Sequence, residues 1–142
     1  MFIQDRASER RFFLHVWRKV KSDQPLEPLE QVVAGIIRRH PEYHALLADK
    51  KSALGAEYPP ESGRPNPFLH MGLHIAIQEQ VMSDRPDGIA KLYKAGLKRL
   101  GDAHELEHRI MECLAETLWR AQGNNTLPDE AGYLDCVHQV VM

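Results

Sequence analysis

Histidine is the residue type whose spacing in this sequence most clearly points to chemistry. Six of the eight histidines form pairs four residues apart: His40 and His44, His70 and His74, and His104 and His108. On an α-helix, residues four apart lie one turn apart on the same face. Each pair can therefore present two imidazoles to one ion or to two neighbouring ions. Neutral imidazoles together with carboxylates favour Fe, Mn or Zn as the bound ion.

The stretch 102–122 adds a carboxylate that sits among apolar residues. Read as a helix, it places Glu107 between Leu114 and Leu118, in the middle of the apolar face. A buried charge without a partner would cost several kcal/mol, so Glu107 must find a partner there. We therefore expect Glu107 to belong to a polar site, and Glu112 is a second carboxylate candidate.

The second and third histidine pairs should occupy corresponding positions on two parallel helices. One helix is expected over 66–82, because Asn66-Pro67 combines a preferred cap residue with proline in the first turn. The other begins at Asp102, a cap residue that Glu105 follows three positions later. Short connections make successive helices antiparallel, so two helices separated by one other helix run parallel. Both pairs lie in the first turns of their helices and should meet in one layer.

Helical spacing of apolar residues also dominates the rest of the chain. Further helices are expected over 4–22, from Pro28 to about His40, over 89–100, and after Pro128. Residues 52–65 carry several prolines and glycines and are expected to form a long loop. Because no alternating strand pattern occurs, we predict an all-α protein. Its residues 1–142 should form a single-domain bundle of five or six helices without a sheet.

The first histidine pair is the weakest of the three as a chelating pair. Proline at position 41 disfavours helical geometry at His40, so the helix should kink or restart there, with His40 near an N-cap. The predicted metal ligands are His70, His74, His104 and His108, with His44, Glu107 and Glu112 as secondary candidates. A bound ion with an open position would activate water or dioxygen, and Glu105 or Glu107 would handle the protons. The sequence does not specify the reaction.

Two other functions compete with this hypothesis. His104 to His108 reads as HExxH, the zinc-peptidase signature in which Glu105 would be the general base, although so short a motif also arises by chance. Alternatively, the histidines and glutamates satisfy one another without metal, and the protein is a non-enzymatic interaction module. In that case a basic first helix, with Arg6, Arg10, Arg18 and Lys21 on its outer side, would dock a partner. A merely solvated helix face is the simpler interpretation of this charge.

The amino-acid composition narrows the classes of protein that remain possible. A formal net charge of −2 argues against nucleic-acid binding by the chain as a whole. No apolar run approaches the roughly 20 residues of a membrane span, so we expect a cytoplasmic protein. Cys113 and Cys136 form no CxxC motif and are expected to be small buried hydrophobes, without a disulfide or a thiolate zinc site. Trp119 and the final Val-Val-Met could serve a homodimer.

Four sequence blocks carry a resemblance to a known family: HPEYH, NPFLHMGLHIAIQEQ, HELEHRIMECLAETLWRAQ and PDEAGYLDC. In this order they resemble a bacterial family catalogued as domain of unknown function 1841. The resemblance covers most of the chain from about His40 onward. It implies a small bacterial cytoplasmic protein, and it assigns no activity, cofactor or catalytic residue.

Overall fold

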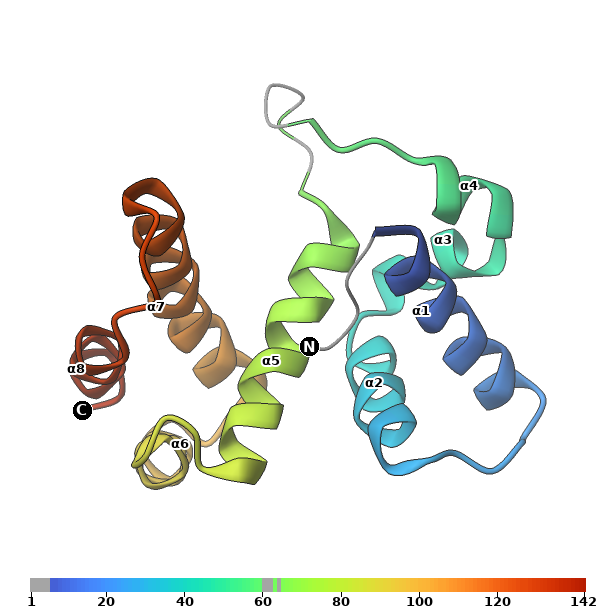
Figure 1. Ribbon diagram of the computed structural model, residues 1–142. Helices are drawn as coiled ribbons and strands as arrows, with labels where there is room; N and C mark the ends of the chain where they lie inside the picture. Colours follow the sequence, from blue (N-terminus) through green and yellow to red (C-terminus); the bar gives the residue numbers. More distant parts are fainter. Residues whose placement is uncertain (1–5, 60–62, 64) are drawn as a thin grey trace. The chain divides into compact units, whose positions relative to one another are not determined.

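The computed structural model describes residues 6–59, 63 and 65–142, and every regular element in this part of the chain is helical. The elements are α1 (Arg6–Lys21), α2 (Pro28–Arg38), the 3₁₀-helix η1 (Pro41–Tyr43), α3 (His44–Ala48), α4 (Lys50–Gly55), α5 (Pro67–Ser83), α6 (Ile89–Leu100), α7 (Ala103–Asn124) and α8 (Glu130–Val141) (Figure 1). The all-α prediction is confirmed. None of the helices among the described residues has the length and apolar character that a membrane crossing requires.

The described residues contain eight α-helices, more than the five or six that we predicted. The difference comes largely from the short helices α3 and α4, which follow η1. Asp49 caps α4 by accepting a hydrogen bond from the Ser52 amide at 3.3 Å. The first residues of the expected loop over 52–65 therefore belong to α4, while residues 60–62 and 64 of that stretch lie outside the described part. Helices of one or two turns are too short to show a 3.6-residue period.

The contacts of the chain divide it into two compact units, Met1–Ile75 and Ala76–Met142, with the boundary inside α5. The sequence predicted one domain over 1–142.

In the first unit, α1 packs against α2, α3 and α4. Apolar residues spaced three or four apart on α1 and α2 meet the beginning of α5 in the core. The fully buried members include Phe13, Val16, Val33, Ile36, Ile37, Met71 and Ile75. The rings of Phe13 and Phe68 lie 5.7 Å apart, which joins α1 to the first turn of α5. This packing holds the first turns of α5 against α1 and α2.

Arg10 departs from the expected basic outer face of α1, because it is only 1% exposed. Its Nη1 donates to the carbonyl oxygens of Ala53 at 3.0 Å and Ala56 at 2.7 Å, and its guanidinium lies 4.7 Å from the Phe68 ring centroid. Burial, reinforced by the nearby Arg6 charge, lowers the pKa of Arg10. The prediction was wrong for this residue, since the carbonyls at the end of α4 compensate the buried charge.

In the second unit, α6, α7 and α8 pack pairwise. Gly101 ends α6 with a φ of 72°, as expected for a glycine stop. A disulfide joins Cys113 of α7 to Cys136 of α8, with an S–S distance of 2.11 Å and a Cα–Cα distance of 5.8 Å. Our expectation of two separate buried thiols is therefore wrong. The pairing depends on how α7 and α8 pack, which the cysteine spacing alone does not reveal.

Candidate metal centre

Three imidazoles lie together in the first unit. The ring centroids of His40 and His70 are 5.1 Å apart, those of His40 and His74 are 5.0 Å apart, and those of His70 and His74 are 4.9 Å apart. His40 and His74 are 1% and 0% exposed. We call these three residues the histidine triad. Two of its members come from one face of α5, as the four-residue spacing predicted.

Local backbone geometry places His40 in the triad. As the cap residue of η1, His40 has φ −125° and ψ 65°, outside the helical region, because Pro41 follows it. The prediction of a break with His40 at an N-cap is confirmed. We had nevertheless set His40 aside as a ligand. The sequence signal that could have identified His40 was the end of α2 before Pro41, because it removes His40 from the helical spacing of α2.

The hydrogen bond of His40 defines which ring nitrogen can ligate a metal. Nδ1 lies 2.7 Å from the carbonyl oxygen of Ile36, which can only accept, so Nδ1 carries the proton and Nε2 carries the lone pair. A ligating histidine commonly donates its other N–H to a carbonyl in this way. Tyr43 stacks on the same ring at 5.3 Å with an interplanar angle of 4°. The ring is thus oriented from two sides.

The separation of the ring nitrogens fits a shared ion after small movements. His40 and His74 each offer one ring nitrogen within 4.8 Å of the other. Two nitrogens bound to one zinc ion at about 2.1 Å can be at most about 4.2 Å apart. The pair of His40 and His74 therefore has the donor type and the approximate spacing of a metal site, and His70 lies beside this pair, with its ring centroid 5.1 Å from that of His40 and 4.9 Å from that of His74.

His44 makes different contacts. Its Nε2 lies 2.9 Å from the carbonyl oxygen of Ile37, and its ring packs on Trp17 with centroids 4.4 Å apart. These contacts join the segment after α2 to α1. His44 thus makes packing contacts in this structure, and its role as a secondary ligand stays a prediction.

The second unit holds the other predicted histidine pair, His104 and His108. Their ring centroids are 4.2 Å apart, and each offers a ring nitrogen within 4.8 Å of the other. Asp102 positions the first turn of α7 by accepting hydrogen bonds from the amides of His104 at 3.0 Å and Glu105 at 3.3 Å. The predicted cap is therefore confirmed, and both imidazoles are half-buried.

Glu107 is buried in the second unit and is hydrogen-bonded, as its place in the apolar face predicted. It is 0% exposed, and Tyr93 Oη donates to its Oε2 at 2.6 Å. Gln78 Nε2 lies 3.5 Å from the same oxygen. Sequence reasoning missed Tyr93 as a partner, because its spacing on α6 signalled only packing. The charge-assisted hydrogen bond offsets part of the cost of burying the carboxylate.

The other two carboxylates proposed from the sequence lie on the surface. Glu105 is exposed and forms an ion pair with Arg109 at 3.2 Å. Glu112 is exposed and lines a pocket of about 570 Å³ beside the Cys113–Cys136 disulfide. Because both cysteines are in the disulfide, the donors available to a metal are imidazoles and carboxylates.

Comparison with known proteins identifies a family. No curated protein and no solved structure matches the chain. A family model described as "Domain of unknown function (DUF1841)" matches residues 5–139, so the resemblance extends well before His40. The chain therefore belongs to the DUF1841 family.

Proposed function

We propose that the protein binds one or two transition-metal ions, Fe, Mn or Zn, through its grouped histidines. The observation that supports this proposal best is the histidine triad, in which three imidazoles have centroids about 5 Å apart. Two of the three are fully buried, and the Ile36 carbonyl orients His40 as it would orient a ligand. The proposed ligands are His40, His70 and His74 in the first unit and His104 and His108 in the second. We also propose, from the order of the helices, that residues 1–142 form a single-domain bundle.

The chemistry of the ion would depend on an open coordination position. An ion that keeps such a position would activate water or dioxygen, and a carboxylate would move the proton. Glu107 suits that role better than Glu105, because it is buried and hydrogen-bonded to Tyr93, whereas Glu105 pairs with Arg109. We assign no reaction.

Elemental analysis of untagged protein, purified without chelator, tests the proposal. We expect stoichiometric Fe, Mn or Zn, reduced in His70→Ala/His74→Ala and, separately, in His104→Ala/His108→Ala. His138→Ala is the matched control, because His138 is exposed on α8. Added ion at about 100 times its Kd should raise the free energy of unfolding by about 2.7 kcal/mol. Metal content unchanged in both double variants would refute the proposal, as would metal-free protein that takes up no ion.

A metal-free interaction module is the second candidate, and the contacts of His44 favour it. The His44 ring is held by the Ile37 carbonyl oxygen and packs on Trp17, as a structural histidine would. Arg10 is used internally, so a docking face on α1 would rely on residues such as Arg11 and Arg18. This candidate predicts metal-free protein of normal stability whose partner is lost in Arg11→Gln/Arg18→Gln. Unchanged partner retention in that variant would count against it.

The zinc-peptidase interpretation gains no support from the site. Its general base, Glu105, is held on the surface by Arg109 in the second unit. A peptidase would have to cleave an unfolded protein in a zinc-dependent reaction, and Glu105→Gln would have to abolish this cleavage.

The cytoplasmic location expected from the sequence stays a prediction, and the Cys113–Cys136 disulfide counts against it. Disulfides persist in oxidising compartments and are rare in the cytosol. Alkylation of thiols in intact cells would decide between the two. Labelled cysteines would support a reducing compartment, and protected cysteines would support an oxidising one.

The homodimer also stays a prediction. On α7, Trp119 is 71% exposed and Leu118 is 44% exposed, although we had placed Leu118 within the buried stripe. These side chains are available to a second copy of the chain. Sedimentation of the wild-type protein and of Trp119→Glu would test this.

A further inference from the structure

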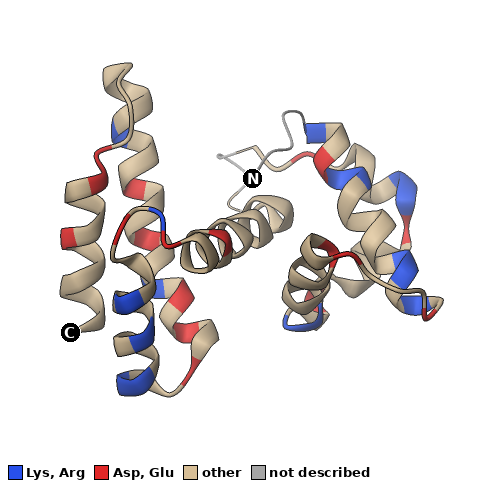
Figure 2. Ribbon diagram, turned by 60° about the horizontal axis from the view of Figure 1, so that its bottom comes forward, with Lys and Arg blue, Asp and Glu red and all other residues tan. Residues whose placement is uncertain are grey.

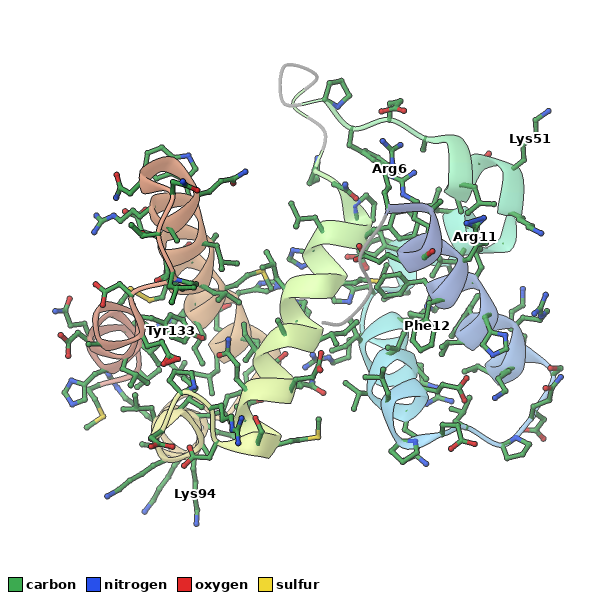
Figure 3. All side chains as sticks on the ribbon, in the orientation of Figure 1. Arg6, Arg11, Phe12, Lys51, Lys94 and Tyr133 are labelled. Carbon is green, nitrogen blue, oxygen red and sulfur yellow. A yellow bond between two sulfur atoms is a disulfide. The ribbon has the colours of Figure 1, made fainter. Side chains whose placement is uncertain are left out.

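A second cavity, lined by none of the members of the histidine triad, lies in the first unit. It has a volume of about 570 Å³ and is bordered by α1, α3 and the start of α4. Its lining includes Arg11, Trp17, Arg18, Lys21, Leu47 and Lys50. We call this cavity the α1 groove. Figure 2 shows basic residues spaced along α1, and Figure 3 shows Arg11 on this helix.

The rim of the α1 groove is strongly cationic. Four of its lining residues are Arg or Lys, and none of the ten described lining residues is acidic. Two carboxylates adjoin the lining residues in sequence. Asp49 is engaged by Ser52, whose hydroxyl donates to it at 2.8 Å, and Asp23, which follows Ser22, is exposed. The chain as a whole has a net charge of −2, so this concentration of positive charge is local.

A third carboxylate near α1, Glu30, is already paired. Lys19 Nζ donates to its Oε1 at 2.8 Å, and His15 Nε2 lies 3.2 Å from its Oε2. The hydrogen bond from Lys19 is the main reason that the pKa of Glu30 lies below its ordinary value. Lys19 thus neutralises Glu30, while Arg11, Arg18 and Lys21 line the groove.

The groove also has an apolar, well-supported wall. Leu47 is buried, and the Trp17 indole packs on the His44 imidazole at 4.4 Å. The hydrogen bond of His44 to the Ile37 carbonyl holds that imidazole in place. Trp17 is therefore positioned before any ligand arrives, and an indole is a good stacking surface for a flat ring.

Helix capping explains only part of this charge. Arg18, Lys19 and Lys21 lie in the last turn of α1, where cations stabilise the negative end of the helix dipole. Arg11 lies in the middle of α1, and Lys50 lies on a different helix, yet both line the same cavity. Capping gives no reason for these two cations to face the groove.

We propose that the α1 groove binds a nucleoside monophosphate or a closely similar phosphorylated aromatic molecule. Guanidinium groups bind phosphate oxygens in bidentate fashion, and Trp17 supplies a surface for the ring. The volume lies within the range of about 300–1,000 Å³ that is usual for small-molecule sites. The shared requirement is one flat ring joined to one dianionic phosphate.

Trp17 can report binding directly. The chain has two tryptophans, and Trp119 on α7 is 71% exposed, so Trp119→Phe leaves Trp17 as the single tryptophan, whose fluorescence can be excited selectively over that of the tyrosines. In this background, titration with AMP in the presence of chelator should change Trp17 fluorescence. Adenosine and inorganic phosphate should each bind at least about tenfold more weakly than AMP, because each lacks half of the recognised chemistry.

Variants distinguish AMP binding in the α1 groove from non-specific binding to positive charge. Arg18→Gln should weaken AMP binding by about tenfold or more, since a hydrogen bond to a charged group is lost. Lys50→Gln, at the exposed start of α4, is the second test in case Arg18→Gln fails to fold. The matched control is Arg120→Gln, because Arg120 is exposed in the second unit, where it forms an ion pair with Glu116 at 2.8 Å. The control should bind AMP as the background protein does.

Several results would overturn the proposal. They are no AMP binding, equal binding of AMP and adenosine, equal binding of AMP and inorganic phosphate, or equal weakening in the Arg120→Gln control. A single-stranded oligonucleotide that binds far more tightly than AMP would replace it with a nucleic-acid site. Because chelator is present throughout, the result is independent of the metal proposal.

Discussion

Single residues in this protein show that burial of a charge requires a specific partner. Glu107 is 0% exposed and accepts from Tyr93, and Arg10 is 1% exposed and donates to two carbonyls. In both cases a hydrogen bond replaces the lost water. The helical pattern identified Glu107 as buried, because it lies in the centre of an apolar face. It could not identify Arg10, whose partners belong to a distant segment.

Tyr93→Phe should destabilise the protein more than Tyr133→Phe. Tyr93 donates to a buried carboxylate at 2.6 Å, and Tyr133 donates to the neutral Gln80 amide oxygen, also at 2.6 Å. We expect losses of about 1.5–3 and about 1 kcal/mol, because a hydrogen bond to a charged group is worth more. Urea unfolding of both variants measures this difference.

The comparison is well matched because both tyrosines lie in the second unit and both changes remove one hydroxyl. Figure 3 labels Tyr133, which is 3% exposed, and burial raises the pKa of its hydroxyl. The hydroxyl therefore donates as a neutral group. Equal losses in the two variants would show that the charge on Glu107 adds nothing to the Tyr93 hydrogen bond.

At the scale of elements, local signals placed the ends of the longer helices. Pro28 starts α2, Asn66 accepts from the Phe68 amide at 2.9 Å at the start of α5, and Gly101 ends α6. These signals act within one turn, so they can be read from a short stretch of sequence. The short helices after His40 carry no comparable period, and the sequence did not reveal them.

The packing of α6 in the second unit depends on a small residue. A Cβ at Gly96 would lie 2.6 Å from Leu106 Cδ1 and 2.9 Å from Val141 Cβ. Gly96→Ala should therefore lower the free energy of unfolding by about 1–3 kcal/mol, despite the better helix propensity of alanine. Thermal and urea unfolding measure the loss.

Gly35→Ala should change the stability in the opposite direction, although Gly35 also lies in a helix. Gly35 lies within α2, and a Cβ there would meet nothing within 4 Å. We expect this change to stabilise the protein by roughly 0.5–1 kcal/mol through helix propensity. If Gly96→Ala and Gly35→Ala changed the free energy of unfolding in the same direction, this result would contradict the role assigned to close packing at Gly96.

At the scale of the whole molecule, the disulfide distinguishes the second unit from the first. Cys113 and Cys136 are separated by 23 residues. Closing a loop of that length stabilises a fold by about 3 kcal/mol in the chain-entropy account. Cys113→Ala/Cys136→Ala should therefore lower the free energy of unfolding by roughly this amount.

Hydrogen exchange can locate the effect of this change. We expect loss of protection in α7 and α8, while α1 and α2 keep theirs, because each unit has its own set of contacts. Reduction of the wild-type protein should reproduce the result of the double variant. Unchanged stability and exchange after complete reduction would refute the stabilising role of the disulfide.

Local patterns were sufficient for the all-α class, most helix ends and the burial of Glu107. Each of these properties depends on residues within a few turns of one another, through helical period, caps and stops. The α5 and α7 histidine pairs were recognisable for the same reason. Residues four apart on a helix necessarily share a face.

Contacts between distant segments required the folded chain. His40 joins His70 and His74, Arg10 meets the carbonyls at the end of α4, and Cys113 bonds to Cys136. Each depends on how side chains of separate elements pack, and no local period or cap encodes that arrangement. The break between α2 and η1 gives His40 its position. In the sequence, the same break was the reason to discount His40 as a ligand.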